Sequence, residues 1–156
     1  MLNKRGTGYV PTCLFIIIFC MILSVLIVFA GAVGVVNLMK RNSKTVLENY
    51  LTQNAIEIYD AVKRGTNEAD AVDAEKYVSA LASFCTFEKN GNEYYHKNDE
   101  GETEYYITEP TVGFTEDGRL RIYASYVLYI PIRFDSVQVT TARVPVTVKV
   151  DLKERY

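Results

Sequence analysis

The residue types that carry catalytic or metal-binding chemistry are sparse in this sequence. Its single histidine, His96, has the chemistry of a proton carrier or metal ligand, but no cysteine stands at ligand spacing from it. The sequence also holds no Gly-x-Ser-x-Gly motif and no phosphate-binding glycine loop. We therefore predict a protein that is not an enzyme, with no catalytic residue, no cofactor and no small-molecule substrate.

An acidic run at residues 98–104, with the sequence NDEGETE, is the best candidate for a cation site. Carboxylate and amide oxygens suit Ca²⁺, but the spacing of this run does not match an EF-hand loop. Acidic residues around a turn glycine are ordinarily solvated. The sequence therefore predicts no metal site.

The three cysteines do not form a disulfide framework. Cys13 and Cys20 lie in an apolar stretch, and Cys85 stands alone in the rest of the chain. Cysteine usage therefore leaves the redox compartment open.

Charge is distributed unevenly along the 156 residues. No charged residue lies between Arg5 and Lys40, whereas all 19 acidic residues and 12 of the 17 basic ones lie from Thr45 onwards, giving that part a net charge of −7. An acidic domain repels phosphate backbones. We therefore expect the protein to bind no nucleic acid.

The uncharged stretch is long enough to cross a bilayer. Residues 10–36 are almost wholly apolar, and about 20 such residues span the hydrocarbon core as a helix. We expect residues 1–9 to form a short segment before this transmembrane helix. A cleavable secretory signal is the alternative, because Ala30-Gly31-Ala32 fits the small-x-small cleavage pattern, but the apolar run exceeds the roughly 7–15 residues of such signals.

Basic residues on the two sides of the span leave its orientation undecided. Lys4 and Arg5 precede it, and Lys40, Arg41 and Lys44 follow it. With the terminal amine counted, the positive-inside rule gives nearly a tie.

A helical pattern continues beyond the span. Apolar residues recur at the period of an amphipathic helix. No proline or glycine lies between Val35 and Arg64, and basic residues followed by Gly65 are typical of a helix C-terminus. We therefore predict one helix from Cys13 to Arg64, with residues 37–65 as the amphipathic extension of its transmembrane part. The apolar stripe of this extension consists of Leu47, Leu51, Ala55, Ile58 and Val62.

Residues 66–156 are expected to form an α+β domain. A second helix is predicted at 74–84, with Asp73 as its N-cap. Asn90-Gly91 stands between two strand-like runs, which predicts a hairpin. We expect a type I′ turn there, because that turn needs positive φ at both residues.

Strands with one core face are predicted further along. Apolar residues alternate with others along residues 120–133 and again along 144–152, and a second turn is predicted at Asp117-Gly118. The predicted fold is therefore α+β, with the long N-terminal helix packed on an antiparallel β-sheet. The expected contacts join Leu51 and Ile58 of the stripe to a sheet face built from Ile122, Tyr126, Val146 and Val148.

Tyrosines come in two adjacent pairs, Tyr94-Tyr95 and Tyr105-Tyr106. If both runs are strands, one tyrosine of each pair points outward. Exposed tyrosine suits a contact surface, and tyrosine also favours strands for reasons unrelated to partners, so both interpretations stay open.

The order of these elements resembles a known architecture. A single N-terminal helix of a little over fifty residues, half in the membrane and half packed on an antiparallel sheet, is similar to that of type IV pilins and pseudopilins. Within that group the chain resembles the TadE-like proteins of tight-adherence (Tad) pilus systems, which begin with a short basic segment and an Arg-Gly before the span, here Lys4-Arg5-Gly6. In pilin-type precursors a glutamate stands five residues after the glycine that precedes the peptidase cut, but here Pro11 stands five after Gly6.

The resemblance implies a pilin-like subunit of a pilus or of a type II/IV-like secretion assembly, in a minor or accessory role. It implies a bacterial cell-membrane protein, found in the membrane or in the pilus, with residues 1–9 cytoplasmic and residues 66–156 extracytoplasmic. The implied partners are the membrane and other pilin-like subunits or pilus assembly proteins. Arg5 and Gly6 would mark a processing site, and because the glutamate is missing we expect the chain to stay uncut.

Small residues in the span would let the helices of such subunits approach closely. They are Ala30, Gly31 and Gly34. A filament subunit should also leave residues 37–43 available to other helices. The alternative is a permanently anchored extracytoplasmic domain that binds a ligand or an envelope component and never enters a filament, and a concave polar pocket on the sheet would indicate it.

Overall fold

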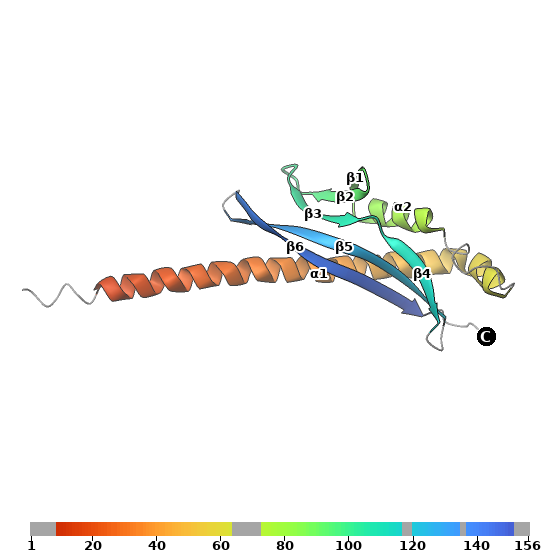
Figure 1. The fold of residues 1–156 in the computed structure, drawn as a ribbon, viewed down its shortest axis with the longest axis horizontal. Coiled ribbons are helices and arrows are strands. Elements are labelled where there is room, and N and C mark those ends of the chain that lie inside the picture. Colours follow the sequence, from red (N-terminus) through yellow and green to blue (C-terminus); the bar gives the residue numbers. More distant parts are fainter. Residues whose placement is uncertain (1–8, 64–72, 117–119, 135–136, 152–156) are drawn as a thin grey trace, which may run out of the picture. The chain divides into compact units, whose positions relative to one another are not determined.

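A computed structural model of the chain describes residues 9–63, 73–116, 120–134 and 137–151 (Figure 1). The chain divides into two compact units at Val35 and Val36, one residue from the predicted end of the span. The elements are α1 (Tyr9–Lys63), α2 (Ala74–Phe84), β1 (Glu88–Asn90), β2 (Glu93–Lys97), β3 (Thr103–Thr108), β4 (Thr111–Glu116), β5 (Leu120–Phe134) and β6 (Val137–Asp151).

The first unit contains the apolar start of α1. By length and composition this stretch can cross a membrane, and its most apolar part has no buried side chain. The helix begins at Tyr9, four residues before the predicted Cys13. Pro11 therefore lies in the first turn, where proline is tolerated because the backbone N–H groups of that turn have no intrahelical acceptor.

In the second unit, α1 continues without interruption to Lys63. Arg64 and Gly65, where the helix was expected to stop, lie outside the described residues. The predicted amphipathic stripe is confirmed for Leu47, Leu51 and Ile58, which are buried. Ala55 is half-buried, and the side chain of Val62 is not among those described. The buried face is wider than predicted and also includes Met39, Ser43, Val46 and Tyr50.

Helix α2 has the predicted bounds and the predicted cap. The Asp73 side chain accepts a hydrogen bond from the backbone N–H of Lys76 at 3.2 Å, which satisfies one of the free donors of the first turn. Its apolar face is buried as expected, through Tyr77, Val78, Leu81 and the following Cys85.

The sheet is built around the two long strands. All its pairings are antiparallel, and β6 lies along β5 from Arg121↔Asp151 to Phe134↔Val137. The other edge of β5 pairs first with β4, along residues 120–125, and then with β3, at Leu128 and Tyr129. Beyond β3 the sheet continues with β2 and then β1. The predicted α+β fold, with a long helix on an antiparallel sheet, is therefore confirmed.

The β1–β2 hairpin is present, but its predicted turn type is wrong. Asn90 pairs with Glu93, so the two loop residues are Gly91 and Asn92. Gly91 has a φ of 63°, whereas the φ of Asn92 is not positive. Among the described non-glycine residues, a positive φ occurs at Thr86, outside this loop. A positive φ at the first central residue alone is the arrangement of a type II′ turn, which places glycine there. The turn is therefore shifted by one residue from Asn90-Gly91.

The second predicted turn, Asp117-Gly118, lies outside the described residues, and Glu116 of β4 pairs with Leu120 of β5 on its two sides. Residues of β5 alternate as predicted between half-buried and buried from Arg121 to Ile130, whereas Ile132, predicted on the core face, is only half-buried. The buried face of the sheet consists of Ile122, Ala124, Tyr126, Leu128 and Ile130 of β5, with Val146 and Val148 of β6.

Candidate functional site

The residues that couple α1 to the domain lie close behind the apolar stretch. Ser43 is completely buried, and its Oγ lies 2.7 Å from the Tyr126 hydroxyl on β5. The Tyr126 hydroxyl in turn donates to the backbone carbonyl of Met39 at 3.3 Å. This order of bonds has the Ser43 hydroxyl donating to the tyrosine oxygen, so both hydroxyl groups are satisfied in the core.

Helix α2 joins the same cluster. The Tyr77 hydroxyl donates to the backbone carbonyl of Ser43 at 3.5 Å, and the Asn42 side-chain amide donates to the Cys85 sulfur at 3.7 Å. One turn of α1, Met39–Ser43, is thus bonded to both β5 and α2. We call Met39, Asn42, Ser43, Tyr77 and Tyr126 the junction cluster.

Burial raises the pKa values of the two phenols in the junction cluster. Desolvation raises the pKa of Tyr126 to about 12, although the bond to Ser43 acts in the opposite direction. The pKa of Tyr77 is also raised, mainly by desolvation. Tyrosine is already neutral at neutral pH, and the raised pKa values keep both phenols protonated, and so able to donate hydrogen bonds, into the alkaline range.

The junction cluster corrects one expectation for residues 37–43. Met39 and Ser43 are covered by the domain itself, while Asn37, Lys40 and Arg41 are exposed. Only one side of this turn is therefore open to other helices. Sequence reasoning missed Met39 and Ser43, although both continue the interval of four back from Leu47, because the hydroxyl of Ser43 breaks the apolar pattern.

The three small residues proposed for helix packing are exposed in the first unit. A Cβ added at Gly31 or at Gly34 would meet nothing within 4 Å. Ala30 is exposed as well. No contact within the described chain explains these positions, so they remain a prediction. Arg5 and Gly6, the predicted processing residues, lie outside the described residues.

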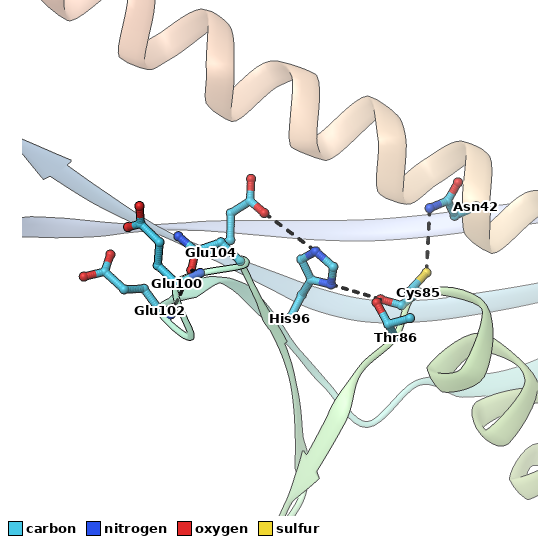
Figure 2. Close-up of polar contacts among 8 residues, drawn as sticks. Asn42, Cys85, Thr86, His96, Glu100, Glu102 and Glu104 are labelled. Atoms are coloured by element: carbon cyan, nitrogen blue, oxygen red, sulfur yellow. Dashed lines mark hydrogen bonds and ion pairs between the residues drawn. The ribbon is translucent and has the colours of Figure 1, made fainter.

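His96 holds neighbouring elements together. Its Nδ1 donates to the backbone carbonyl of Cys85 at 3.0 Å, and its Nε2 lies 3.7 Å from Glu104 (Figure 2). Its ring stacks on Tyr105 with centroids 4.7 Å apart and meets the edge of Phe87. Through the bond to Cys85 and the stacking on Tyr105, the histidine links β2 to the end of α2 and to β3.

The acidic run forms a turn through its own asparagine. The Asn98 side-chain oxygen accepts hydrogen bonds from the backbone N–H groups of Glu100 and Glu102 at 3.1 and 2.9 Å. Glu102 pairs with Arg133, and Glu104 turns toward His96 (Figure 2). Within the described part of the chain, no three His, Cys, Asp or Glu residues gather so as to hold a metal ion.

A row of tyrosines crosses the sheet face opposite the buried one. Tyr94 and Tyr105 are buried, as predicted for one member of each pair, and Tyr95 and Tyr106 point to the other side. Tyr129 of β5 extends the row, with ring centroids 5.0 Å apart for the first stacked pair and 4.8 Å for the second. We call Tyr95, Tyr106 and Tyr129 the tyrosine row.

The tyrosine row is flanked by opposite charges. Strand pairing places Glu88 next to Tyr95 and Arg143 next to Tyr129. The Tyr95 hydroxyl donates to Glu93, and this bond is the main reason why the pKa of Tyr95 is raised to about 12. Because the rings stack on one another, a partner meets mostly their edges and hydroxyl groups. The two adjacent tyrosine pairs in the sequence predicted that one tyrosine of each pair would face outward, as Tyr95 and Tyr106 do. Tyr129 was not predicted, because its pairing partner in β3 is distant in the sequence.

A groove lies between α1 and α2 rather than on the sheet. It has a volume of about 620 Å³. The Tyr50 hydroxyl at this groove accepts a hydrogen bond from the backbone N–H of Asp73 at 3.0 Å. Its polar and apolar lining residues are Val46, Asn49, Tyr50, Gln53, Asn54, Asp73, Glu75, Lys76, Ser79, Ala80 and Phe84. This is not the concave polar pocket on the sheet that an anchored binding domain was expected to have.

Comparisons with protein-family models, with characterised proteins and with solved structures found no match for this chain.

Proposed function

We propose that the protein is a pilin-like, single-pass membrane subunit, similar to TadE-like proteins, that acts without enzymatic activity in a pilus or secretion assembly. Its N-terminus is cytoplasmic and its α+β domain extracytoplasmic. The observation that carries the proposal is that one helix, α1, has an uncovered apolar stretch and then a stretch packed on an antiparallel sheet. A minor or accessory role fits a chain that lacks the glutamate of pilin-type precursors.

The uncovered stretch supports a subunit that exchanges lipid contacts for helix contacts. Lipid tails are as apolar as leucine, so transmembrane helices associate through close packing rather than through a hydrophobic driving force. Ala30 and Gly34 are four residues apart on one helix face, and a Cβ added at Gly34 meets no atom of the described residues within 4 Å. This face is therefore open for a neighbouring subunit.

The junction cluster supports transmission of force or orientation from the helix to the domain. Ser43 and Met39 are bonded to Tyr126 within eight residues of Val35. A domain held on a flexible linker would not need its first helical turn bonded to the sheet. A subunit that is moved by its helix does need such a connection.

Oxidative cross-linking in native membranes tests the proposal. At about 100° per residue, Cys20 lies near the face of Gly34, whereas Ala32 lies on the opposite face. We expect a disulfide through Cys20 to a second small single-pass protein or to another copy, and a several-fold loss of this product in Gly34→Leu. Ala32→Leu, a small-to-large change in the same segment, is the matched control and should leave the product unchanged.

Equal loss in both variants, or no product with any single-pass protein, would contradict assembly through this face. The intact mass of the protein from its native membrane is a second readout. We expect the uncut chain; a mature chain starting at Thr7 would show processing after Gly6, and one starting near Val33 would establish the secretory signal instead.

The tyrosine row favours a second candidate, a permanently anchored domain that binds an envelope component. Tyrosine edges and hydroxyls flanked by Glu88 and Arg143 form a polar contact surface. Under this alternative, Tyr106→Ser should abolish the cellular role while Gly34→Leu has no effect. The pilin-like function predicts that Gly34→Leu has the larger effect.

A further inference from the structure

The sheet face opposite the buried one is less polar than a solvated face usually is. An antiparallel sheet that covers a core with one face normally carries polar side chains on the other. Here the tyrosine row crosses that face, and Val127 of β5 and Pro145 of β6 are paired beside it. Tyrosine is enriched at protein–protein contacts, where its ring supplies area and its hydroxyl a hydrogen bond. We call this surface, with Glu88 and Arg143 at its margins, the open face.

Five residues cross the open face in one line, each on a different strand. Cross-strand pairing sets their order from β1 to β6 as Glu88, Tyr95, Tyr106, Tyr129 and Arg143. Strands about 4.8 Å apart place the two ends of the line roughly 19 Å from each other. The line therefore has a carboxylate at one end, a guanidinium at the other and a tyrosine at its centre.

The two ends of the line carry opposite net charge. At the β1 end the Glu88 carboxylate lies 2.5 Å from the Lys97 ammonium. Glu93, on the same face, accepts the hydrogen bond of the Tyr95 hydroxyl, so two carboxylates stand there against one ammonium. At the β6 end Arg143 is exposed and forms no ion pair with a described residue. One negative and one positive charge are thus left without a partner on this face.

This order of residues makes the open face complementary to itself. Half a turn about an axis that lies parallel to β3, above Tyr106, lays the open face of a second copy on that of the first. The strands of both sheets then run in the same direction, which is the aligned class of sheet packing. The order across the strands is reversed, so Arg143 of each copy faces Glu88 of the other and the two Tyr106 side chains meet. Half a turn about an axis perpendicular to the strands places Arg143 against Arg143 instead, which like-charge repulsion disfavours.

We propose that the open face is a contact between two copies of this chain, related by the two-fold axis parallel to β3. The two tyrosine rows form its centre, and the pairs of Arg143 with Glu88 form its rim, the usual order of aromatic core and charged margin. The inference does not rest on the proposed function, since every residue that carries it belongs to the second unit. It also differs from the helix contact at Gly34, which lies in the first unit.

Charge reversal in the full chain tests this contact. All variants carry Gly34→Leu, which removes the helix contact of the proposed function, and sedimentation in mild detergent measures the dissociation constant of the dimer. We expect the Gly34→Leu chain to dimerise. Adding Arg143→Glu or Glu88→Lys should raise the dissociation constant about tenfold or more, because each change puts two like-charge contacts into the dimer.

Lys149→Glu is the matched control. It makes the same change of charge on the same face of β6, at an exposed side chain. Six residues separate Lys149 from Arg143, about 20 Å along the strand, so it lies away from the line. The dissociation constant should change by less than about twofold, as for other exposed charges without a close partner.

A mixture of the two charge variants separates a lost contact from a damaged fold. A dimer of one Arg143→Glu chain and one Glu88→Lys chain has opposite charges at both ends of the line. An equal mixture should therefore dimerise, although each variant alone does so poorly. The chain with both changes should recover for the same reason, whereas unfolded variants would recover in neither case.

Three results would overturn the inference. They are a mixture that does not dimerise, an equal loss in Lys149→Glu, and a Gly34→Leu chain that stays monomeric at every concentration. The last result would mean that something other than a second copy, such as an envelope component, covers the open face. Cross-linking through Cys20, which tests the proposed function, does not depend on any of these results.

Discussion

The two stretches of α1 share one helical conformation but differ in what covers their apolar side chains. Before Val36, Phe15 and Ile27 have exposed fractions of 72% and 64%. After it, Leu47 and Ile58 are completely buried. The same residue chemistry therefore ends in two environments within a single helix.

This difference separates helix formation from helix burial. Backbone hydrogen bonds within a helix are local, so both stretches become helical without information from the rest of the chain. The cover of the second stretch comes from β5 and β6, whose residues follow about sixty or more positions later. The first stretch has no such cover among the described residues, and its length and composition are those of a helix that can cross a membrane.

The largest expected effect comes from a change in the covered stretch, near the end of α1. Ile58→Ala should lower the free energy of unfolding of the domain by about 2–5 kcal/mol, because it leaves a cavity in the core. Urea unfolding of the full chain in detergent, followed by tyrosine fluorescence, measures this loss. Ile56→Ala, at a side chain that is 81% exposed, is the control and should stay within about 0.5 kcal/mol. A loss below that limit at Ile58 would mean that the stripe does not face the sheet.

Breaking helix α1 near the boundary between its two stretches should cause the next largest loss of stability. Two glycines inserted after Asn42 should cost about 1 kcal/mol each in helix propensity and should also separate Met39 from Ser43 in the junction cluster. Two glycines inserted between Gly91 and Asn92, in a hairpin loop, serve as the control, because lengthening a short loop is cheaper. Equal stability and unchanged assembly after the insertion at Asn42 would show that no continuous helix is needed.

Stability at alkaline pH tests whether Tyr126 of the junction cluster is buried. The pKa of Tyr126 is about 12 in the folded protein and about 10 when unfolded, so the unfolded state loses this proton first as pH rises. Its contribution is complete below pH 10 and falls between pH 10 and 12 by at most about 1.4 kcal/mol per pH unit. The unfolding free energy of Tyr126→Phe should therefore fall less steeply across this range than that of the original chain. Parallel curves would place the Tyr126 hydroxyl in water.

The smallest effect is expected in the uncovered stretch. Gly34→Leu should leave the stability of the isolated chain within about 0.5 kcal/mol, because a Cβ added there meets no atom of the described residues within 4 Å. The thermal or urea midpoint in detergent checks this. A marked loss of stability would reveal an intramolecular contact at Gly34 and weaken the interpretation of this face as an assembly surface.

Local sequence signals predicted most of the elements. The 3.6-residue period found the buried side chains Leu47, Leu51 and Ile58, and Asp73 marked the start of α2, because amphipathic helices and caps are determined within a few residues. Alternation likewise found the buried face of β5. These features depend on residues that are close in the sequence, and they could therefore be predicted from it.

Features that depend on contacts between residues far apart in the sequence could not be predicted from it. Ser43 can be buried because Tyr126, 83 residues later, is its hydrogen-bond partner. No local sequence pattern predicts that partner. Tyr129 joins the tyrosine row because β5 pairs directly with β3, although β4 separates the two strands in the sequence. The turn at Gly91 also shifted by one residue, since Asn90-Gly91 suits type I′ while the pairing of Asn90 with Glu93 selects type II′.

Amide hydrogen exchange of the full chain in lipid vesicles tests most directly whether one helix serves both as membrane anchor and as domain core. We predict continuous protection from Val33 through Leu47, because each backbone N–H there bonds to the carbonyl four residues earlier. The expected protection at Ser43 should match that of Leu47. A fast-exchanging segment of several residues between Val35 and Ser43 would contradict the account, because it would place a linker between the anchor and the domain.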